Sequence, residues 1–333
     1  MTLYSVWGAS RHWEQTTPHP EPIYQEHIFQ GSDDVPLFGW VAIPENPKAT
    51  IVGTYGITGD LNNQWFLRLL GRKAFAQGFA VVLFDWRAHG KTAELSPTLT
   101  SDGLYEGEDF VRISAQSKKL GCPAPFWFTG YSLGGQLALW GIKKAEALEA
   151  NFGLKTSEIA GGAVICPSLD SERSLRYLMA HPIGQYMEKA ITQQLQRLAW
   201  HLHQFHPQEI DPAAIQRANS IWGFDQELVI PRLGFASVSD YYTASSALPF
   251  LPYLSKPTLI IYAADDPLFH PQLVPELEAI GKANSALDLM VTRYGGHVGY
   301  ISSKVGQRLA NDPDQWWAWN RVLDWFNQRS PLT

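Results

Sequence analysis

Six short apolar runs without alternation constrain the fold of this 333-residue chain more than any other feature. A strand that faces water on one side alternates apolar and polar residues, so runs without alternation are typical of strands covered on both faces. Longer amphipathic stretches separate the runs, which is the pattern of repeated β-α units. The sequence therefore predicts an α/β fold with a mostly parallel central sheet and helices on both faces, its strands at residues 49–56, 79–86, 125–131, 159–166, 257–264 and 287–294.

The segments around these runs predict a hairpin and several helices. Residues 24–30 and 37–43 alternate weakly, which indicates an antiparallel hairpin at one edge of the sheet. Apolar residues three and four positions apart predict helices at residues 63–77, 106–120, 134–151, 271–284 and 313–328. For the last of these helices, Asp312 would be the N-cap residue and Pro313 the proline of the first turn.

Residues 167–249 interrupt the alternation of strands and helices, because they contain helical patterns and loops but no clear core strand. We expect them to form a helical cap inserted into a core domain of residues 1–166 and 250–333. The cap would lie over the carboxyl edge of the sheet, where open α/β sheets bind their ligands. Its apolar stripe at helical spacing is a candidate roof for a substrate pocket and consists of Met187, Ile191, Leu195, Leu198, Leu202 and Phe205.

The pentapeptide GYSLG at residues 130–134 matches the G-x-S-x-G pattern of a nucleophile elbow. The elbow is a sharp turn from a strand into a helix, and side chains at its flanking positions would collide with the chain. Here the pattern follows a predicted strand and opens a predicted helix, which is the context that the elbow requires. The α/β-hydrolase fold is therefore expected, with Ser132 as the nucleophile.

A serine hydroxyl needs a base, and the base needs an acid that orients it. In α/β hydrolases the acid and then the base follow the serine along the chain. His297 lies in a glycine-rich loop after the last predicted strand, and Asp265 and Asp266 follow the strand before it. The spacing from the strand end favours Asp266 as the acid, and Asp265 remains the alternative, with a capping role otherwise. His89 precedes the nucleophile, breaks this order and is interpreted as loop structure.

The tetrahedral intermediate of such a reaction needs two backbone N–H donors for its oxyanion. We expect one from Leu133, directly after the nucleophile, and the other from Ile57, in the loop after the first core strand. The side chains expected to contact the substrate are Tyr131, Met187, Leu198 and Leu202.

Composition and missing motifs exclude several other classes of protein. The net charge is -6 and no basic stripe occurs, which argues against nucleic acid binding. Two distant cysteines and no apolar leader favour a cytoplasmic protein, and no apolar stretch is long enough to span a membrane, although peripheral contact stays compatible with the sequence. No nucleotide-binding loop follows a strand, and the cap histidines are interpreted as solvated, so we expect no cofactor and no metal.

Three stretches resemble the YheT-like α/β hydrolases, a branch that includes plant embryogenesis-associated proteins and animal lipase-like members. They are GYSLGGQLAL around Ser132, DYYTASSALPFLPYLSKPTLIIYAADDP leading into Asp266, and YGGHVGY around His297. The resemblance runs from about residue 35 to residue 326 and includes Arg87 and the segment 105–109. At the oxyanion strand the family usually has His-Gly, whereas this chain has Tyr55 followed by glycine.

The resemblance implies a triad of Ser132, Asp266 and His297 that acts on carboxylic esters, lipid-derived ones among them, and the apolar stripe of the cap favours medium-chain acyl groups. The partner would then be a small-molecule ester. An acyltransferase, which moves the acyl group to an alcohol, would use the same residues, and so would an amidase. A non-catalytic binding protein on this scaffold is disfavoured, because no member of the triad is missing.

Overall fold

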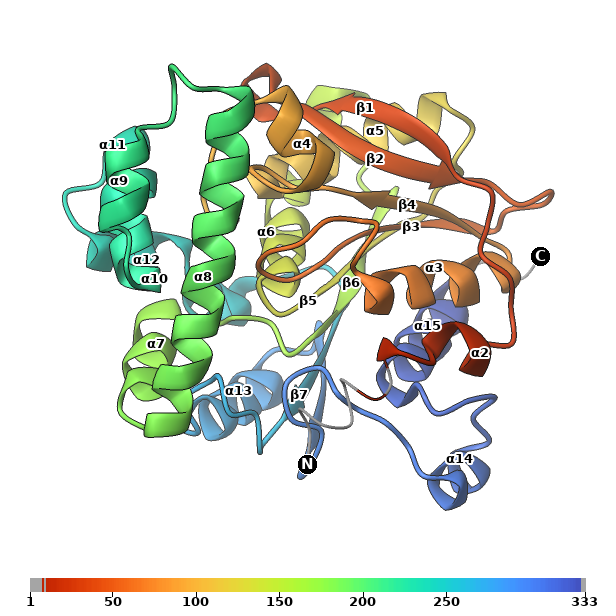
Figure 1. Ribbon diagram of the computed structural model, residues 1–333. Coiled ribbons are helices and arrows are strands. Elements are labelled where there is room, and N and C mark those ends of the chain that lie inside the picture. The colour runs from red at the N-terminus through yellow and green to blue at the C-terminus, as the bar shows by residue number, and fades with distance from the viewer. Residues whose placement is uncertain (1–7, 9, 331–333) are drawn as a thin grey trace.

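The computed structural model describes residue 8 and residues 10–330, and its centre is a twisted eight-stranded sheet (Figure 1). The strand order is β1-β2-β4-β3-β5-β6-β7-β8, in which only the β1–β2 and β2–β4 pairs are antiparallel. The strands are β1 Gln25–Gln30, β2 Pro36–Ala42, β3 Ala49–Thr54, β4 Phe79–Phe84, β5 Phe126–Tyr131, β6 Ile159–Ile165, β7 Thr258–Ala263 and β8 Leu287–Thr292.

Each predicted core strand is confirmed, with ends that differ by at most two residues. Every residue of β3, β4, β5 and β7 is buried, which explains why these runs lack alternation. The expected edge hairpin is the β1–β2 pair, whose register runs from Gln25 opposite Val41 to Gln30 opposite Pro36.

Helices cover both faces of the sheet (Figure 1). α5 and α6 pack against each other on one face, and α3 and α15 lie on the other. The α-helices outside the segment between β6 and β7 are α2 Trp13–Thr16, α3 Trp65–Ala76, α4 Gly90–Leu95, α5 Glu106–Lys119, α6 Leu133–Leu148, α13 Leu273–Ala283, α14 Lys304–Ala310 and α15 Trp317–Arg329. Short 3-10 turns are η1 Ser32–Asp34, η2 Ala150–Phe152 and η4 Leu248–Tyr253.

The last predicted helix, 313–328, begins four residues too early, because α15 starts at Trp317. The carboxylate of Asp314 is buried, accepts a hydrogen bond from the Trp316 N–H and pairs with the Lys73 ammonium group. These contacts hold the residues before α15 in an irregular conformation. The predicted helix start with its N-cap at residues 312–313 is therefore wrong, since a tertiary ion pair overrides the local signal for a helix start.

The segment 167–249, called the cap segment below, contains helices and turns and no strand. Its buried apolar residues, Leu202, Ile215 and Tyr241 among them, form a second hydrophobic core that also includes Ala88, Ala93 and Leu99 from the region after β4. Figure 1 shows its helices grouped at one end of the sheet. No helix among the described residues is both long and apolar enough to cross a bilayer. The helices of the segment are α7 Ser171–Met179, α8 Pro182–Phe205, α9 Pro212–Arg217, α10 Ile221–Phe224, the π-helix η3 Asp225–Val229, α11 Ile230–Leu233 and α12 Val238–Ser245.

A buried ion pair ties the loop after β4 to the start of α5. The Arg87 guanidinium donates to both carboxylate oxygens of Asp109, over 2.8 and 2.9 Å, and also to the Ser32 carbonyl. A bidentate pair of this kind holds two segments in a single geometry. The arginine and the aspartate that carry part of the family resemblance are therefore structural, and they fix the loop that runs past the candidate site.

Candidate active site

The turn between β5 and α6 places Ser132 at the carboxyl edge of the sheet, at the centre of the strand order. Ser132 has φ 55° and ψ −130°, a conformation that is costly for a residue with a side chain. A Cβ atom on Gly130 would lie 2.3 Å from the Gly134 carbonyl oxygen, and one on Gly134 would lie 2.2 Å from the Tyr55 carbonyl oxygen. Both glycines are therefore required by close backbone packing.

Two hydrogen bonds connect Ser132 to His297 and His297 to Asp266. The Ser132 Oγ lies 2.9 Å from the His297 Nε2, and the His297 Nδ1 lies 2.8 Å from the Asp266 Oδ2. A carboxylate only accepts, so Nδ1 carries the proton and Nε2 is free to accept the serine proton. The other Asp266 oxygen accepts the Leu268 N–H at 2.9 Å, which fixes the carboxylate. The acid side chain is 1% exposed, whereas that of the histidine is 17% exposed.

Asp265, the alternative acid, points elsewhere. Its side chain is exposed and accepts a hydrogen bond from the Gly296 N–H at 2.7 Å. It therefore supports the loop that presents His297 without contacting the imidazole ring. The geometry selects Asp266 as the histidine's partner, and Asp265 has the capping role left open for it.

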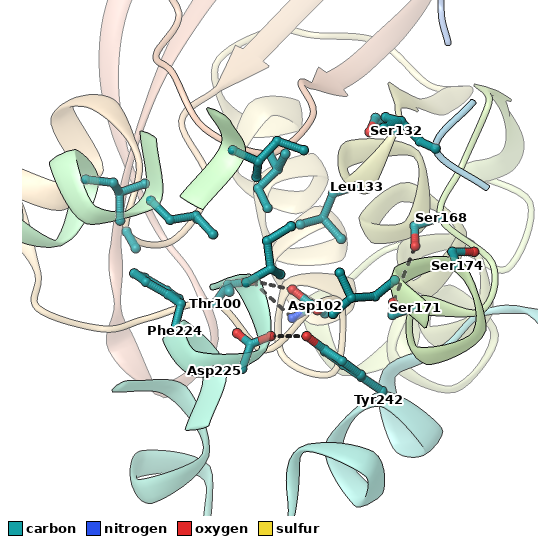
Figure 2. A pocket seen from close by; sticks show the side chains of 18 of the residues that line it. Thr100, Asp102, Ser132, Leu133, Ser168, Ser171, Ser174, Phe224, Asp225 and Tyr242 are labelled. Carbon is teal, nitrogen blue, oxygen red and sulfur yellow. Dashed lines mark hydrogen bonds between the residues drawn. The ribbon is translucent and has the colours of Figure 1, made fainter. Parts of the chain in front are cut away.

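A cavity extends from Ser132 between the sheet edge and the cap segment (Figure 2). Its volume is about 140 Å³, against roughly 10–15 Å³ needed for one water molecule on the same measure. It therefore has room for a chain of several carbons. The apolar side chains that line it come from both parts of the protein, Ile57, Trp86, Ala88, Leu99, Leu133, Leu268 and Phe269 from the core and Leu175, Leu178, Ile191, Leu195, Leu198, Ile221 and Phe224 from the cap segment.

Of the four expected substrate contacts, the structure places one in the cavity wall, Leu198. Leu202 is fully buried in the core of the cap segment, one helical turn further along α8. Tyr131 packs against Phe66 and Trp319, with its hydroxyl donating to a glutamine. Met187 is half-buried outside the cavity lining. The expectation for these last three is corrected, because only part of the stripe on α8 faces the cavity.

The cavity also has a polar region, which the sequence did not indicate. Asp102 and Asp225 line it, and the Tyr242 hydroxyl donates to Asp225 (Figure 2). Burial, together with the nearby charge of Glu106, raises the pKa of Asp102 to about 7, and burial and the charge of Asp102 raise the pKa of Asp225 well above its ordinary value. No spacing marks these residues, since a loop and the cap segment bring them together only in the folded chain.

The remaining histidines near the site are not grouped as metal ligands in the described part of the chain. Within residues 10–330 no group of three or more His, Cys, Asp or Glu side chains is arranged to hold a metal ion. On the cap segment, the rings of His203 and His206 contact the carbonyl oxygens of Ile210 and Ala93. His89 lines the cavity and is 2% exposed, whereas the sequence suggested a loop residue with no place in the site.

Comparison with known proteins settles the family. Residues 50–303 match the family described as alpha/beta hydrolase fold. The chain belongs to this family. This α/β hydrolase is 55% identical to "Putative esterase slr0264" from Synechocystis over 99% of its own length and 92% of the relative's. It is 28% identical to "Putative esterase YheT" from Escherichia coli, over 92% of the chain and 84% of that protein.

More distant similarities extend to a longer relative and to a solved structure. Human "Phospholipase ABHD3" is 26% identical over 76% of this chain, and the match spans 59% of that longer protein. The structure of the Pyrococcus furiosus esterase Pf2001 superimposes with a TM-score of 0.57 at 16% identity, covering 95% of both chains. At this identity the superposition supports the common fold alone.

We expect the two neighbouring aspartates to differ sharply when each is changed to asparagine. Asp266→Asn should lower kcat by about 10⁴, because the amide leaves the histidine in the wrong tautomer. Asp265→Asn, the matched control, removes one exposed hydrogen-bond acceptor and should cost roughly tenfold or less. Steady-state kinetics on a p-nitrophenyl ester measures both, and equal or reversed costs would contradict the geometry.

The buried carboxyl of Asp102 should make folding stability depend on pH. A carboxyl has a pKa of about 4 in the unfolded chain, so the folded state with its pKa of about 7 binds the proton more tightly. The contribution of the Asp102 carboxyl to the free energy of unfolding is complete at pH values below its unfolded pKa and is lost as the pH rises through about 7. Asp102→Asn should therefore reduce the loss of thermal stability between pH 5 and pH 8. The surface variant Asp324→Asn should keep the wild-type pH dependence, and identical curves for both variants would refute this.

Proposed function

We propose that this α/β hydrolase cleaves carboxylic esters through an acyl-enzyme intermediate on Ser132. The observation that carries the proposal is the chain of hydrogen bonds from the Ser132 Oγ through His297 to Asp266, with distances of 2.9 and 2.8 Å. A serine held in this way has the base and the orienting acid that nucleophilic attack requires. The relatives named as esterases over nearly their whole length support an ester as the substrate.

In the proposed mechanism, the Ser132 Oγ attacks the ester carbonyl while the His297 Nε2 takes its proton. Asp266 keeps the imidazole in the required tautomer and stabilises the imidazolium that forms. His297 then donates the proton to the leaving alcohol, and a water molecule repeats the cycle on the acyl-enzyme. These residues need no metal or organic cofactor for any step.

The negative charge that develops on the carbonyl oxygen would be stabilised by the N–H groups of Leu133 and Ile57. Leu133 is the first residue of α6, so its N–H has no partner within the helix, and the helix N-terminus favours negative charge. The Ile57 N–H has no hydrogen-bond partner among the described residues. Its loop touches the nucleophile, because a Cβ atom on Gly56 would lie 2.9 Å from the Ser132 Cβ.

The cavity supports an apolar chain as the part of the substrate next to the ester. Its walls are mostly aliphatic and aromatic, with Ser168, Ser171 and Ser174 among the polar lining residues, and no lysine or arginine of the described part of the chain lines it. Burial of each methylene contributes about 0.8 kcal/mol, so longer acyl chains bind more tightly until the cavity is full. The carboxyl groups of Asp102 and Asp225 limit this gain, since an alkyl chain that reaches them must desolvate them without a hydrogen bond.

Covalent labelling tests the nucleophile. A fluorophosphonate probe should label the wild-type protein on Ser132, and Ser132→Ala should abolish labelling and lower kcat for p-nitrophenyl esters by about 10⁴ or more. Ser168→Ala is the matched control, because this serine also lines the cavity and is not hydrogen-bonded to a histidine among the described residues. Unchanged labelling of Ser132→Ala, or absence of ester hydrolysis by the wild type, would overturn the proposed function.

The dependence on chain length tests the pocket. From acetate upward, kcat/KM should rise about three- to fourfold per methylene and be highest at roughly six to ten carbons. Leu198→Trp should move this maximum to shorter chains, since the larger side chain fills part of the cavity. Gln194→Trp places the same ring on the exposed face of α8 and should leave the profile unchanged. A profile that stays the same in folded Leu198→Trp would show that acyl chains bind elsewhere.

A further inference from the structure

The loop after β3 approaches the nucleophile in a conformation that needs support from outside. It includes Ile57, the proposed oxyanion donor, and next to it Thr58, whose φ of +65° is rare for a residue with a branched Cβ. A residue in this region persists only where surrounding contacts hold it. The position of the Ile57 N–H therefore depends on what fixes its neighbour.

His89 supplies this contact. Its Nε2 accepts the Thr58 N–H at 3.1 Å, and its Nδ1 lies 2.8 Å from the Arg87 carbonyl oxygen. A carbonyl oxygen only accepts, so Nδ1 must carry the proton and Nε2 must be bare, and a single neutral tautomer satisfies both bonds. The ring is 2% exposed and stacks on Trp86 with ring centroids 3.6 Å apart.

The neutral state of His89 is also favoured by its surroundings. Burial lowers the pKa of this imidazole to about 3. Protonation would add a hydrogen to Nε2 and replace the bond to Thr58 with a clash between two donors. The environment therefore keeps the ring in the form that the loop needs across the neutral pH range.

Asp85 holds the same loop at two further points. One of its carboxylate oxygens accepts both the Tyr55 hydroxyl, at 2.5 Å, and the Leu61 N–H, at 2.9 Å. The other oxygen accepts the Lys91 N–H at 3.0 Å. Tyr55 stands where the family that this chain resembles has a histidine, so its hydroxyl provides side-chain support for the loop at that position.

We propose that His89 is a positioning residue, which holds the Thr58 amide and thereby directs the Ile57 N–H at the oxygen of the tetrahedral intermediate. Asp85 fixes the two ends of the same loop, through the Tyr55 hydroxyl and the Leu61 N–H. The inference rests on the proposed function, because it assumes an oxyanion at this place. A donor fixed before the reaction loses no energy to reorganisation, whereas a donor on a loose loop must be ordered in each turnover. His89 takes no part in proton transfer.

His89→Phe tests the role, because phenylalanine keeps the stacking on Trp86 and removes the acceptor. Loss of a whole oxyanion donor costs about 10²–10³ in kcat, so loosening one should cost about 10–100-fold, with KM changed less than about threefold. A trifluoromethyl ketone, which forms a tetrahedral adduct with the serine, should lose affinity in parallel with kcat. His89→Gln should recover part of the loss, since its amide oxygen can accept from Thr58.

His206→Phe is the matched control, because it makes the same exchange at a ring that contacts only the Ala93 carbonyl among its described polar partners. It should keep both kcat and the ketone affinity. If folded His89→Phe has kcat and ketone affinity within twofold of the wild type, the inference is wrong. It is also wrong if only KM rises, because His89 would then merely line the cavity.

A second variant covers the case in which His89→Phe does not fold. Tyr55→Phe removes the hydroxyl that donates to Asp85, whose carboxylate keeps its two backbone N–H donors. The change should lower kcat and ketone affinity together by about three- to tenfold. Unchanged values would overturn the inference. Failure of the proposed function is distinct, since it would appear as a wild-type protein that cleaves no ester, while failure of the inference leaves wild-type hydrolysis intact.

Discussion

The close approach of three backbone segments at Ser132 is the constraint on which the rest of the site depends. The turn brings Gly130 against Gly134, and Gly134 against the carbonyl of Tyr55, at distances that leave no room for a Cβ atom. This packing forces the serine to a positive φ and, in the same step, brings the loop after β3 against the nucleophile. The proposed nucleophile and the proposed oxyanion donors are thus packed against each other, and contacts from His89 and Asp85 hold the loop in that position.

Several buried carboxyl groups of the core have basic partners, whereas those of the cavity have none among the described residues. In the core, Arg87 with Asp109 and Lys256 with Glu149 form ion pairs that satisfy each carboxylate and join distant segments. In the cavity, the charge of Asp102 acts on Asp225, and burial raises the pKa of both. Paired charges in the core fix the geometry of the loops, because breaking such a pair leaves an uncompensated buried charge. The carboxyl groups of Asp102 and Asp225, which have no ion-pair partner among the described residues, instead set a polar limit to a pocket that is mostly apolar.

Much of the fold could be predicted because the signals are local. Strands covered on both faces are recognised by unbroken apolar runs, and all six were located to within two residues. The start of the last helix was wrong for the opposite reason, since Asp314 is held by Lys73, a residue 241 positions earlier in the chain. Similarly, the periodicity of α8 revealed an apolar face but could not say which partner each residue meets. Leu198 faces the cavity, and Leu202 faces the core of the cap segment.

The sequence by itself determined the order of strands and helices, the elbow at Ser132 and the chain order of acid and base. Each of these depends on residue types that local backbone geometry requires or on a spacing within one unit. Only the tertiary structure decided between Asp265 and Asp266, because adjacent side chains leave the backbone in different directions and one of them reaches His297. The same holds for His89, whose two ring nitrogens acquire a role only when the loops after β3 and β4 lie side by side. Contacts between segments far apart in the chain have no local signal, and those contacts give the site its geometry.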